Sequence, residues 1–219
     1  MRAVILDMDG VIVDSEHQWK LAEGAFLRRI APGWREEDHH KLVGLGVVDL
    51  YYWLVREYEI QEPLERFLAD CDVLSKGIYN NRVSLTDGLA GFIADVKKNR
   101  VPLGLASSSP KSWIDMVLDR FGLRKDFDAV VNGDETPGRT KPAPDLYLLA
   151  AERLAVKPRE CLAIEDSVLG VRAAKSAGMA CAGFRNGTNE EQDFSQADFE
   201  IRSFLGLSYG SLSSRLKGA

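Results

Sequence analysis

Cysteine and long apolar runs are scarce in this chain of 219 residues, and each scarcity excludes a class of protein. The three cysteines, Cys71, Cys161 and Cys181, cannot pair completely and have no Cys-x-x-Cys spacing, so we expect small buried apolar residues in a reduced chain. The first apolar run is too short for a signal peptide, and no later run approaches the ~18 residues of a membrane span. We therefore expect a cytoplasmic protein with no membrane partner.

Basic charge is also in deficit. The chain has 28 Lys and Arg against 33 Asp and Glu, a net charge of −5, and lacks the basic stripe that nucleic-acid binding requires. The 45% hydrophobic and 28% charged residues fit a globular protein with a core and exclude disorder. At ~100–200 residues per domain, the length indicates one large domain or a medium domain with an insertion.

Short continuous apolar runs recur along the chain, and helical periodicity fills most of the stretches between them. Such runs are typical of strands that are buried on both faces of a parallel sheet. Gly122 and Gly178 stand where two of the helices are expected to end, and the Ser/Gly-rich tail 208–219 is expected to fray. The alternation predicts an α/β fold with a doubly wound parallel sheet. Its expected strands are 3–6, 101–106, 129–131, 161–164 and 179–182.

Residues 15–82 interrupt this alternation. They contain nine of the 19 aromatic residues in under a third of the chain and have the pattern of several helices without a buried strand. The sequence therefore predicts an α/β core, residues 1–14 and 83–219, with an all-helical insertion, residues 15–82.

Two carboxylates follow the first expected strand. Asp7 and Asp9 precede Gly10 at the carboxyl end of that strand, where doubly wound sheets place their sites. If the segment stays extended, both side chains point to one face. Two solvated aspartates in a turn would have the same pattern, so the pair alone leaves both interpretations open.

Three serines follow the second expected strand. Hydroxyl groups and the free amides at a helix start form a phosphate site, and Ser107, at the strand tip, is the better ligand candidate. Helix capping is the alternative, with Ser109 as N-cap and Pro110 at the first helical position. We expect Ser109 to cap in either case.

The third and fourth polar stretches are Lys141, in a loop stiffened by two prolines, and the pair Glu165 and Asp166 after another apolar run. A solvated lysine and a helix cap at Asp166 or Ser167 are the simpler alternatives. Together, however, the four stretches place carboxylates, hydroxyls and an ammonium group at one edge of a parallel sheet. Carboxylates suit Mg²⁺, which needs few protein ligands and accepts a phosphate oxygen.

These residues resemble the motifs of the haloacid dehalogenase superfamily. Asp7-Met8-Asp9-Gly10-Val11 is similar to its first motif, Ser107 to its second, Lys141 to its third and Glu165-Asp166 to its fourth. The resemblance covers essentially the whole chain, and the insertion resembles the helical C1-type cap. Asp14-Ser15 is similar to the subgroup that contains β-phosphoglucomutase and small sugar-phosphate phosphatases.

The resemblance implies a phosphatase that works through an aspartyl phosphate. Asp7 is then the nucleophile and Asp9 the general acid and base. Mg²⁺ is held by Asp7, the backbone carbonyl of Asp9 and Asp166. Glu165 is either a further ligand or a residue that supports the ligands.

The remaining motif residues bind the phosphoryl group by the same resemblance. Ser107, Ser108 and Lys141 hold its oxygens, and Lys141 keeps Asp7 ionised. Because the dehalogenase members lack an aspartate at the position of Asp9, phosphoryl transfer is favoured over dehalogenation.

Phosphatase and mutase are harder to separate. In the mutase, an Arg in the cap loop grips a second phosphate and a His follows the first motif; the corresponding positions here are Val47 and Trp19. This favours hydrolysis over the mutase reaction. A phosphate-sensing protein without activity is the non-enzymatic alternative, and the complete motif set argues against it.

The segments 14–19 and 44–52 are similar to hexose-phosphate phosphatases, which points to a sugar or polyol phosphate. Candidate specificity residues are Trp19, Gly44, Leu45 and Val47, although the loop of Gly44 can also simply join two helices. We expect a monomer whose partner is a small phosphorylated molecule, with no nucleic acid bound.

Overall fold

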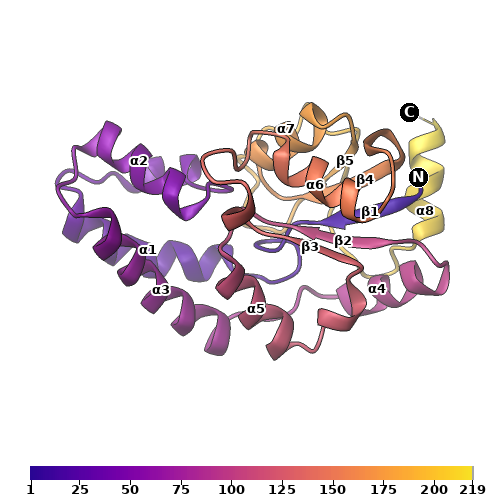
Figure 1. Cartoon of the computed structure of the whole chain (residues 1–219), viewed down its shortest axis with the longest axis horizontal. Coiled ribbons are helices and arrows are strands. Elements are labelled where there is room, and N and C mark those ends of the chain that lie inside the picture. The colour runs from indigo at the N-terminus through magenta and orange to yellow at the C-terminus, as the bar shows by residue number, and fades with distance from the viewer. Residues whose placement is uncertain (219) are drawn as a thin grey trace.

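The sheet contains six parallel strands in the order β3-β2-β1-β4-β5-β6 (Figure 1). A computed structural model describes residues 1–218 of the chain. The strand order reverses beside β1, and such switch points are where doubly wound sheets bind ligands. The strands are β1 (Ala3–Leu6), β2 (Leu103–Ala106), β3 (Ala129–Val131), β4 (Cys161–Glu165), β5 (Ala180–Phe184) and β6 (Phe199–Ile201).

The predicted fold class is confirmed, and each expected apolar run contains a strand. The sequence missed β6 because this strand is only three residues long and has an exposed Glu200 at its centre, so it forms no apolar run. It pairs with β5 at the end of the sheet.

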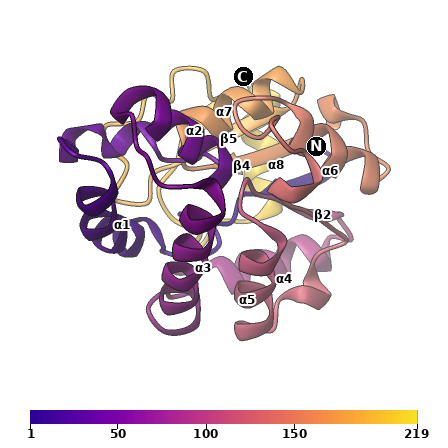
Figure 2. The ribbon, with the colours of Figure 1, turned by 60° about the vertical axis from the view of Figure 1, so that its left-hand side comes forward.

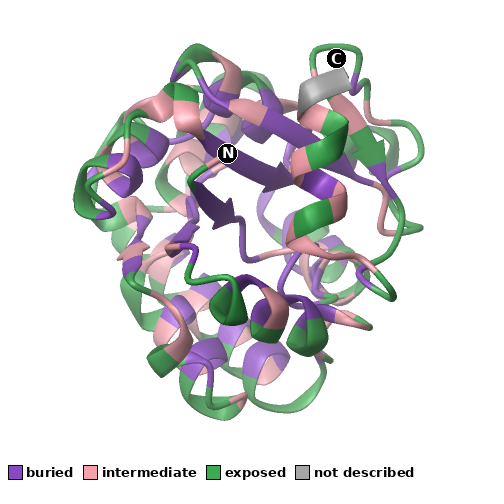
Figure 3. Ribbon diagram, turned by 90° about the vertical axis from the view of Figure 1, so that its right-hand side faces the viewer, coloured by how far each residue is buried: buried purple, intermediate pink, exposed green. Residues whose placement is uncertain are grey.

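Helices cover both faces of the sheet, which explains the continuous apolar strands. Val4 and Leu6 of β1 belong to the core shared with α4, α5 and α8, while Ala3 and Ile5 belong to the core shared with α6 and α7. Figure 3 shows the buried strands between the helices. The helices are α4 (Leu89–Lys98), α5 (Lys111–Arg120), α6 (Asp145–Arg153), α7 (Val168–Ser176) and α8 (Tyr209–Gly218).

Two of these helices end where the sequence predicts, whereas the C-terminal tail differs from its prediction. Gly122 and Gly178 follow the ends of α5 and α7 with positive φ, as expected for helix stops. The prediction of a frayed tail is wrong for the described residues, because α8 occupies most of it. Leu212 is fully buried, and the hydroxyl of Tyr209 donates to the carbonyl of Met1 at 2.8 Å.

Three helices and a 3₁₀ turn lie between β1 and α4 and form one end of the molecule (Figures 1 and 2). Their aromatic residues pack on one another, with the Phe67 ring 5.5 Å from that of Phe26. The chain enters and leaves this helical insert at neighbouring points, because the amide of Thr86 donates to the carbonyl of Ile12 at 3.0 Å. The division into a core, 1–14 and 83–219, and a cap, 15–82, stays a prediction. The insert helices are α1 (Glu16–Ile30), α2 (Val47–Tyr58) and α3 (Leu64–Asn81), with the turn at Glu36–Lys41.

None of the helices among the described residues combines the length and apolar character needed to cross a membrane.

We predict that Phe204→Ala destabilises the protein by about 3–5 kcal/mol, the usual cost of removing a buried phenyl ring. The ring of Phe204 lies 5.2 Å from that of Phe92 on α4 and 4.9 Å from that of Phe184 on β5. The measurement is urea unfolding followed by circular dichroism. The neighbouring Leu205, which is 70% exposed, is the control, and Leu205→Ala should change stability by less than about 0.5 kcal/mol. Equal losses in the two variants would contradict this account of the core.

Candidate active site

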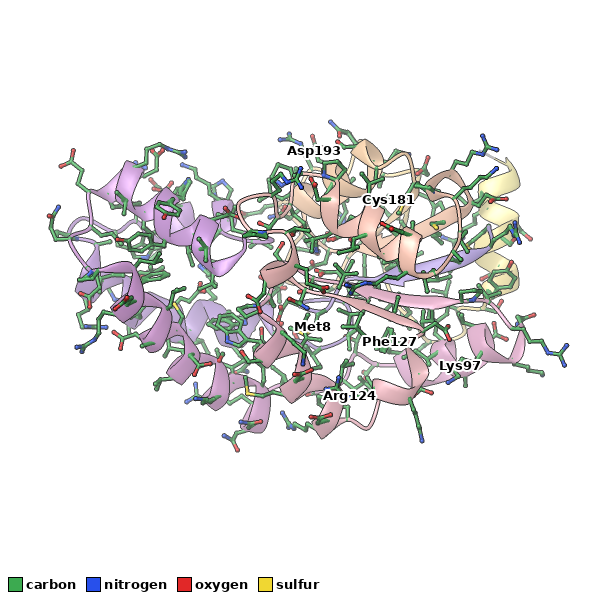
Figure 4. All side chains as sticks on the ribbon, viewed as in Figure 1. Met8, Lys97, Arg124, Phe127, Cys181 and Asp193 are labelled. Carbon is green, nitrogen blue, oxygen red and sulfur yellow. The ribbon has the colours of Figure 1, made fainter. Side chains whose placement is uncertain are left out.

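All predicted site residues except Glu165 line one pocket at the carboxyl ends of the central strands. Asp7 follows β1 and its amide donates to the carbonyl of Ile164 at 3.1 Å, while the amide of Ser107, after β2, donates to Val131 at 3.1 Å. The insert supplies the opposite wall, and Met8, labelled in Figure 4, lies where the insert meets the sheet. Predicted residues that line the pocket are Asp7, Asp9, Ser107, Ser108, Lys141 and Asp166 from the strand ends, and Trp19, Gly44, Leu45 and Val47 from the insert.

A buried ammonium group joins two of the strand ends. Lys141 Nζ lies 2.7 Å from Asp7 Oδ1 and 2.5 Å from Glu165 Oε1, and all three side chains are almost completely inaccessible to solvent. Burial alone would lower the pKa of Lys141, but the charges of Asp7 and Glu165 raise it above its usual value. Lys141 therefore stays charged, and the interpretation as a solvated loop lysine is wrong.

The single positive charge of Lys141 does not neutralise the negative charges of the carboxylates around it. Burial, with the charge of Glu165, raises the pKa of Asp7 to about 8, although the ion pair with Lys141 acts in the opposite direction. Burial also raises the pKa of Asp166 well above its usual value. The expectation that Lys141 keeps Asp7 ionised is thus only part of the account, because the site needs further positive charge to hold its carboxylates ionised.

The donor set fits a hard divalent cation. Asp7, Glu165 and Asp166 each offer a carboxylate oxygen, and these oxygens lie within 4.8 Å of one another. All three residues are buried, and oxygen-only ligands are what Mg²⁺ prefers.

Asp166 is held by an asparagine that the sequence did not single out. Asn186 Nδ2 donates to Asp166 Oδ2 at 2.9 Å and to the carbonyl of Gly10 at 3.2 Å. Gly10 has a φ of +70°, and a Cβ there would lie 1.9 Å from Asp166 Oδ2, so only glycine fits this turn. Asn186 lies in a loop rich in Gly and Asn, and nothing in its local sequence distinguishes it from a turn residue.

Glu165 is fully buried and does not line the pocket. Its Oε1 accepts hydrogen bonds from Lys141 and from the Tyr147 hydroxyl, and its Oε2 accepts from Ser167 Oγ at 3.3 Å. Ser167 also caps α7, since its hydroxyl accepts the amide of Gly170 at 3.0 Å, as one sequence interpretation expected. Because both of its carboxylate oxygens already accept hydrogen bonds from protein groups, Glu165 is best placed to hold Lys141 in position.

Three hydroxyl groups hold the carboxylate of Asp9. Ser15 Oγ and the Tyr79 hydroxyl donate to Oδ1 at 2.7 and 2.8 Å, and Ser109 Oγ donates to Oδ2 at 2.9 Å. The prediction that Ser109 is a helix N-cap is wrong: α5 begins at Lys111, and Ser109 makes no cap. Tyr79 was not predicted as a site residue because it lies 70 residues from Asp9 in the chain.

The other two serines present hydroxyl groups at the end of β2. Ser107 Oγ accepts the amide of Ser109 at 3.1 Å, which leaves the hydroxyl proton of Ser107 free for a ligand. Ser108 Oγ is buried and has no hydrogen-bond partner among the described residues. Because an unpaired buried hydroxyl is costly, this group is consistent with a site for a ligand oxygen.

The loop that was predicted to carry specificity residues approaches the strand ends closely. Gly44 has a φ of +86°, and a Cβ there would lie 2.6 Å from Ser167 Oγ. A Cβ on Gly46 would lie 3.1 Å from Thr140 Oγ1. The side chain of Thr140 donates to Asp49 in the first turn of α2. The loop therefore does more than join two helices: it packs against the core beside Lys141.

The insert wall is acidic and aromatic. Glu16, Trp19 and Glu23 lie on one face of α1 and line the pocket. The Trp19 ring stacks on that of Trp113 at 5.0 Å. Burial, together with the charge of Asp9, raises the pKa of both Glu16 and Glu23 to about 8.

Known proteins share this arrangement of elements. A family model for haloacid dehalogenase-like hydrolases matches residues 1–178. The chain belongs to this family. The predicted resemblance to the haloacid dehalogenase superfamily is thus confirmed, and the protein is a hydrolase of that group.

Relatives of the hydrolase include phosphatases and a mutase. It is 35% identical over 179 residues to the phosphorylated carbohydrates phosphatase of Thermotoga maritima, covering 82% of each chain. It is 33% identical over 214 residues to the β-phosphoglucomutase of Bacillus subtilis, covering 92% of this chain and 89% of the relative. The crystal structure of CbbY from Rhodobacter sphaeroides in complex with phosphate has a TM-score of 0.84 and 25% identity, and the match covers 97% and 99% of the two chains.

We predict that Gly170→Ala destabilises the protein by about 1–3 kcal/mol, as overpacking does, and also lowers activity. A Cβ at this position would lie 2.0 Å from the carboxylate of Glu165, which must then move away from Lys141. Thermal unfolding measures the effect. Gly91, within helix α4, is the matched control: a Cβ there meets no atom within 4 Å, so Gly91→Ala should stabilise the protein by about 0.5–1 kcal/mol. A neutral Gly170→Ala would show that Glu165 has room to move.

Proposed function

We propose that this hydrolase is a Mg²⁺-dependent phosphatase that acts on a small sugar or polyol phosphate through an aspartyl-phosphate intermediate. The observation that carries the proposal is the pairing of Asp7, bound to the buried Lys141, with Asp9, held by three hydroxyl groups, in one pocket. The phosphorylated carbohydrates phosphatase of Thermotoga maritima supports the substrate class by its similarity.

In the first step, Asp7 is the nucleophile. One of its carboxylate oxygens attacks phosphorus, the bond between phosphorus and the substrate oxygen breaks, and Asp9 gives a proton to that leaving oxygen. Lys141 and the hydroxyl groups of Ser107 and Ser108 bind the phosphoryl oxygens and offset their charge.

In the second step, Asp9 reverses its role. It takes a proton from water as the water oxygen attacks phosphorus, and the bond between phosphorus and Asp7 breaks to release inorganic phosphate. Both catalytic carboxylates are then restored, and Asp9 again carries the proton for the next substrate.

The residues that would hold Mg²⁺ are Asp7, Asp166 and the backbone carbonyl of Asp9. Glu165 instead forms an ion pair with Lys141. Bound there, the ion supplies positive charge that reduces the repulsion between an anionic nucleophile and an anionic phosphate. Asn186 keeps Asp166 oriented toward this position through its hydrogen bond.

The helical insert, residues 15–82, acts in this proposal as a cap that encloses the substrate and selects it. Trp19, Leu45 and Val47 face the substrate from the cap side of the pocket. Gly44 allows their loop to pack closely against the core.

The second candidate is a phosphosugar mutase, which the similarity to β-phosphoglucomutase favours. A mutase must bind a second phosphate. Among the described residues that line the pocket, however, Lys141 is the one lysine or arginine, and the insert wall carries Glu16 and Glu23 instead. Beyond Lys141, the described lining residues offer no lysine or arginine for a second phosphate, which supports hydrolysis.

We predict that the purified protein releases phosphate from 4-nitrophenyl phosphate and from a subset of sugar and polyol monophosphates when MgCl₂ is present. Asp7→Asn should reduce phosphate release to background, because an amide cannot serve as the nucleophile. Chelation by EDTA should abolish release, and added Mg²⁺ should restore it. Asp119→Asn, at the exposed end of α5, is the control and should retain full activity. A wild-type rate in Asp7→Asn would overturn the mechanism.

Product analysis separates hydrolysis from the mutase reaction. We predict that hexose 1-phosphates, if turned over, yield free sugar and inorganic phosphate in equal amounts, with no hexose 6-phosphate, even when a hexose bisphosphate is added. Phosphorus NMR resolves these products, and the Bacillus subtilis mutase serves as the positive control. Formation of glucose 6-phosphate from β-glucose 1-phosphate without phosphate release would reverse the assignment.

A further inference from the structure

Tyr79 brings the end of the insert into contact with the proposed general acid. It lies in the last turn of α3, its side chain is fully buried, and its hydroxyl donates to Asp9 Oδ1 at 2.8 Å. The same side chain lines the pocket.

The direction of this hydrogen bond is fixed by Trp19. The indole Nε1–H of Trp19 can only donate, and it donates to the Tyr79 oxygen at 3.0 Å. Tyr79 has a single hydroxyl proton, and Asp9 is the acceptor for it. Trp19 thus orders the phenol so that its proton points at Asp9.

Contacts with the core keep Tyr79 in this place. An Arg120 Nη1–H donates to the backbone carbonyl of Tyr79 at 2.5 Å, and the Tyr79 ring lies 5.9 Å from that of Trp113. Both Arg120 and Trp113 belong to α5, which follows β2 and the serines after it. Tyr79 is therefore fixed from the core as well as from the insert.

We propose that Tyr79, ordered by Trp19, is a positioning residue that orients the carboxyl group of Asp9 for proton transfer to the leaving oxygen. The inference rests on the proposed phosphatase function. It adds that the insert takes part in the chemical step through α3, in addition to enclosing the substrate. Ser15 and Ser109 still hold the carboxyl group when the phenol is removed, so the loss is partial.

The effect of such a residue depends on the leaving group. A poor leaving group needs a proton in the transition state, and a positioned acid contributes ~10²–10⁴-fold to that step. A good leaving group, such as 4-nitrophenolate, departs without it. A purely structural role for Tyr79 would slow both classes of substrate equally.

The test compares phenyl phosphate with 4-nitrophenyl phosphate, which have similar shapes and different leaving groups. The comparison uses kcat/KM, which reports the first step and excludes the water attack that both esters share. Tyr79→Phe should lower kcat/KM for phenyl phosphate about tenfold and leave kcat/KM for 4-nitrophenyl phosphate nearly unchanged. Asp9→Asn should show the same selectivity in kcat/KM more strongly, and it should also slow the second step for both esters. Trp19→Phe, which keeps an aromatic ring but frees the Tyr79 oxygen, should lower kcat/KM for phenyl phosphate by a smaller factor.

Tyr51→Phe is the matched control. Tyr51 lies in α2 of the insert, and its hydroxyl donates to the carbonyl of Glu62 outside the pocket lining, so both substrates should be hydrolysed at wild-type rates. Equal losses of kcat/KM on both esters in Tyr79→Phe, or no loss on either, would overturn the proposal for Tyr79. Failure of the wild-type protein to hydrolyse either ester would instead overturn the phosphatase function itself. A crystal structure of Tyr79→Phe checks the fold and should show the Asp9 carboxyl group in more than one orientation, with Ser15 and Ser109 still holding part of the population; a single unchanged orientation would also contradict the proposal.

Discussion

The ammonium group of Lys141 is the interaction on which the site depends. It lies between Asp7 at the end of β1 and Glu165 at the end of β4, two neighbouring parallel strands whose carboxylates would otherwise repel each other in a buried space. A buried ion pair contributes little net stability, because desolvation offsets most of the attraction. Its contribution here is to hold the charged side chains in fixed positions. Tyr147 and Ser167 fix Glu165, Glu165 fixes Lys141, and Lys141 fixes Asp7.

The position of the site could be predicted from the sequence because topology alone brings the strand ends together. In a parallel sheet, residues that follow different strands meet at one edge, so Asp7, Ser107 and Asp166 were found without any knowledge of side-chain packing. Asn186 and Tyr79 could not be predicted in this way. Each acts through a side chain delivered by an element far along the chain, and its local sequence is that of an ordinary loop or helix.

Local rules failed where tertiary contacts compete with them. Ser109 has the residue type of an N-cap, but Pro110 occupies the N-cap position of α5, and the Ser109 hydroxyl donates to Asp9. The C-terminal tail has a composition typical of a loose end. It is nevertheless helical up to Gly218, since burial of Leu212 and the bond from Tyr209 to Met1 hold it on the sheet domain.

The close packing of the insert against the strand ends links the shape of the pocket to the geometry of its charged groups. The hydrogen bond between Thr140 and Asp49 joins α2 to the residue directly before Lys141. On the other side, Gly44 lies against Ser167, which holds Glu165. The loop that carries Leu45 and Val47 therefore packs against Thr140, next to Lys141 in the chain, and against Ser167, which holds the partner of Lys141. A larger side chain at Gly44 would have to move the loop or Ser167, and one at Gly46 would have to move the loop or Thr140. The size of the pocket and the geometry of its charges therefore cannot vary independently in this protein.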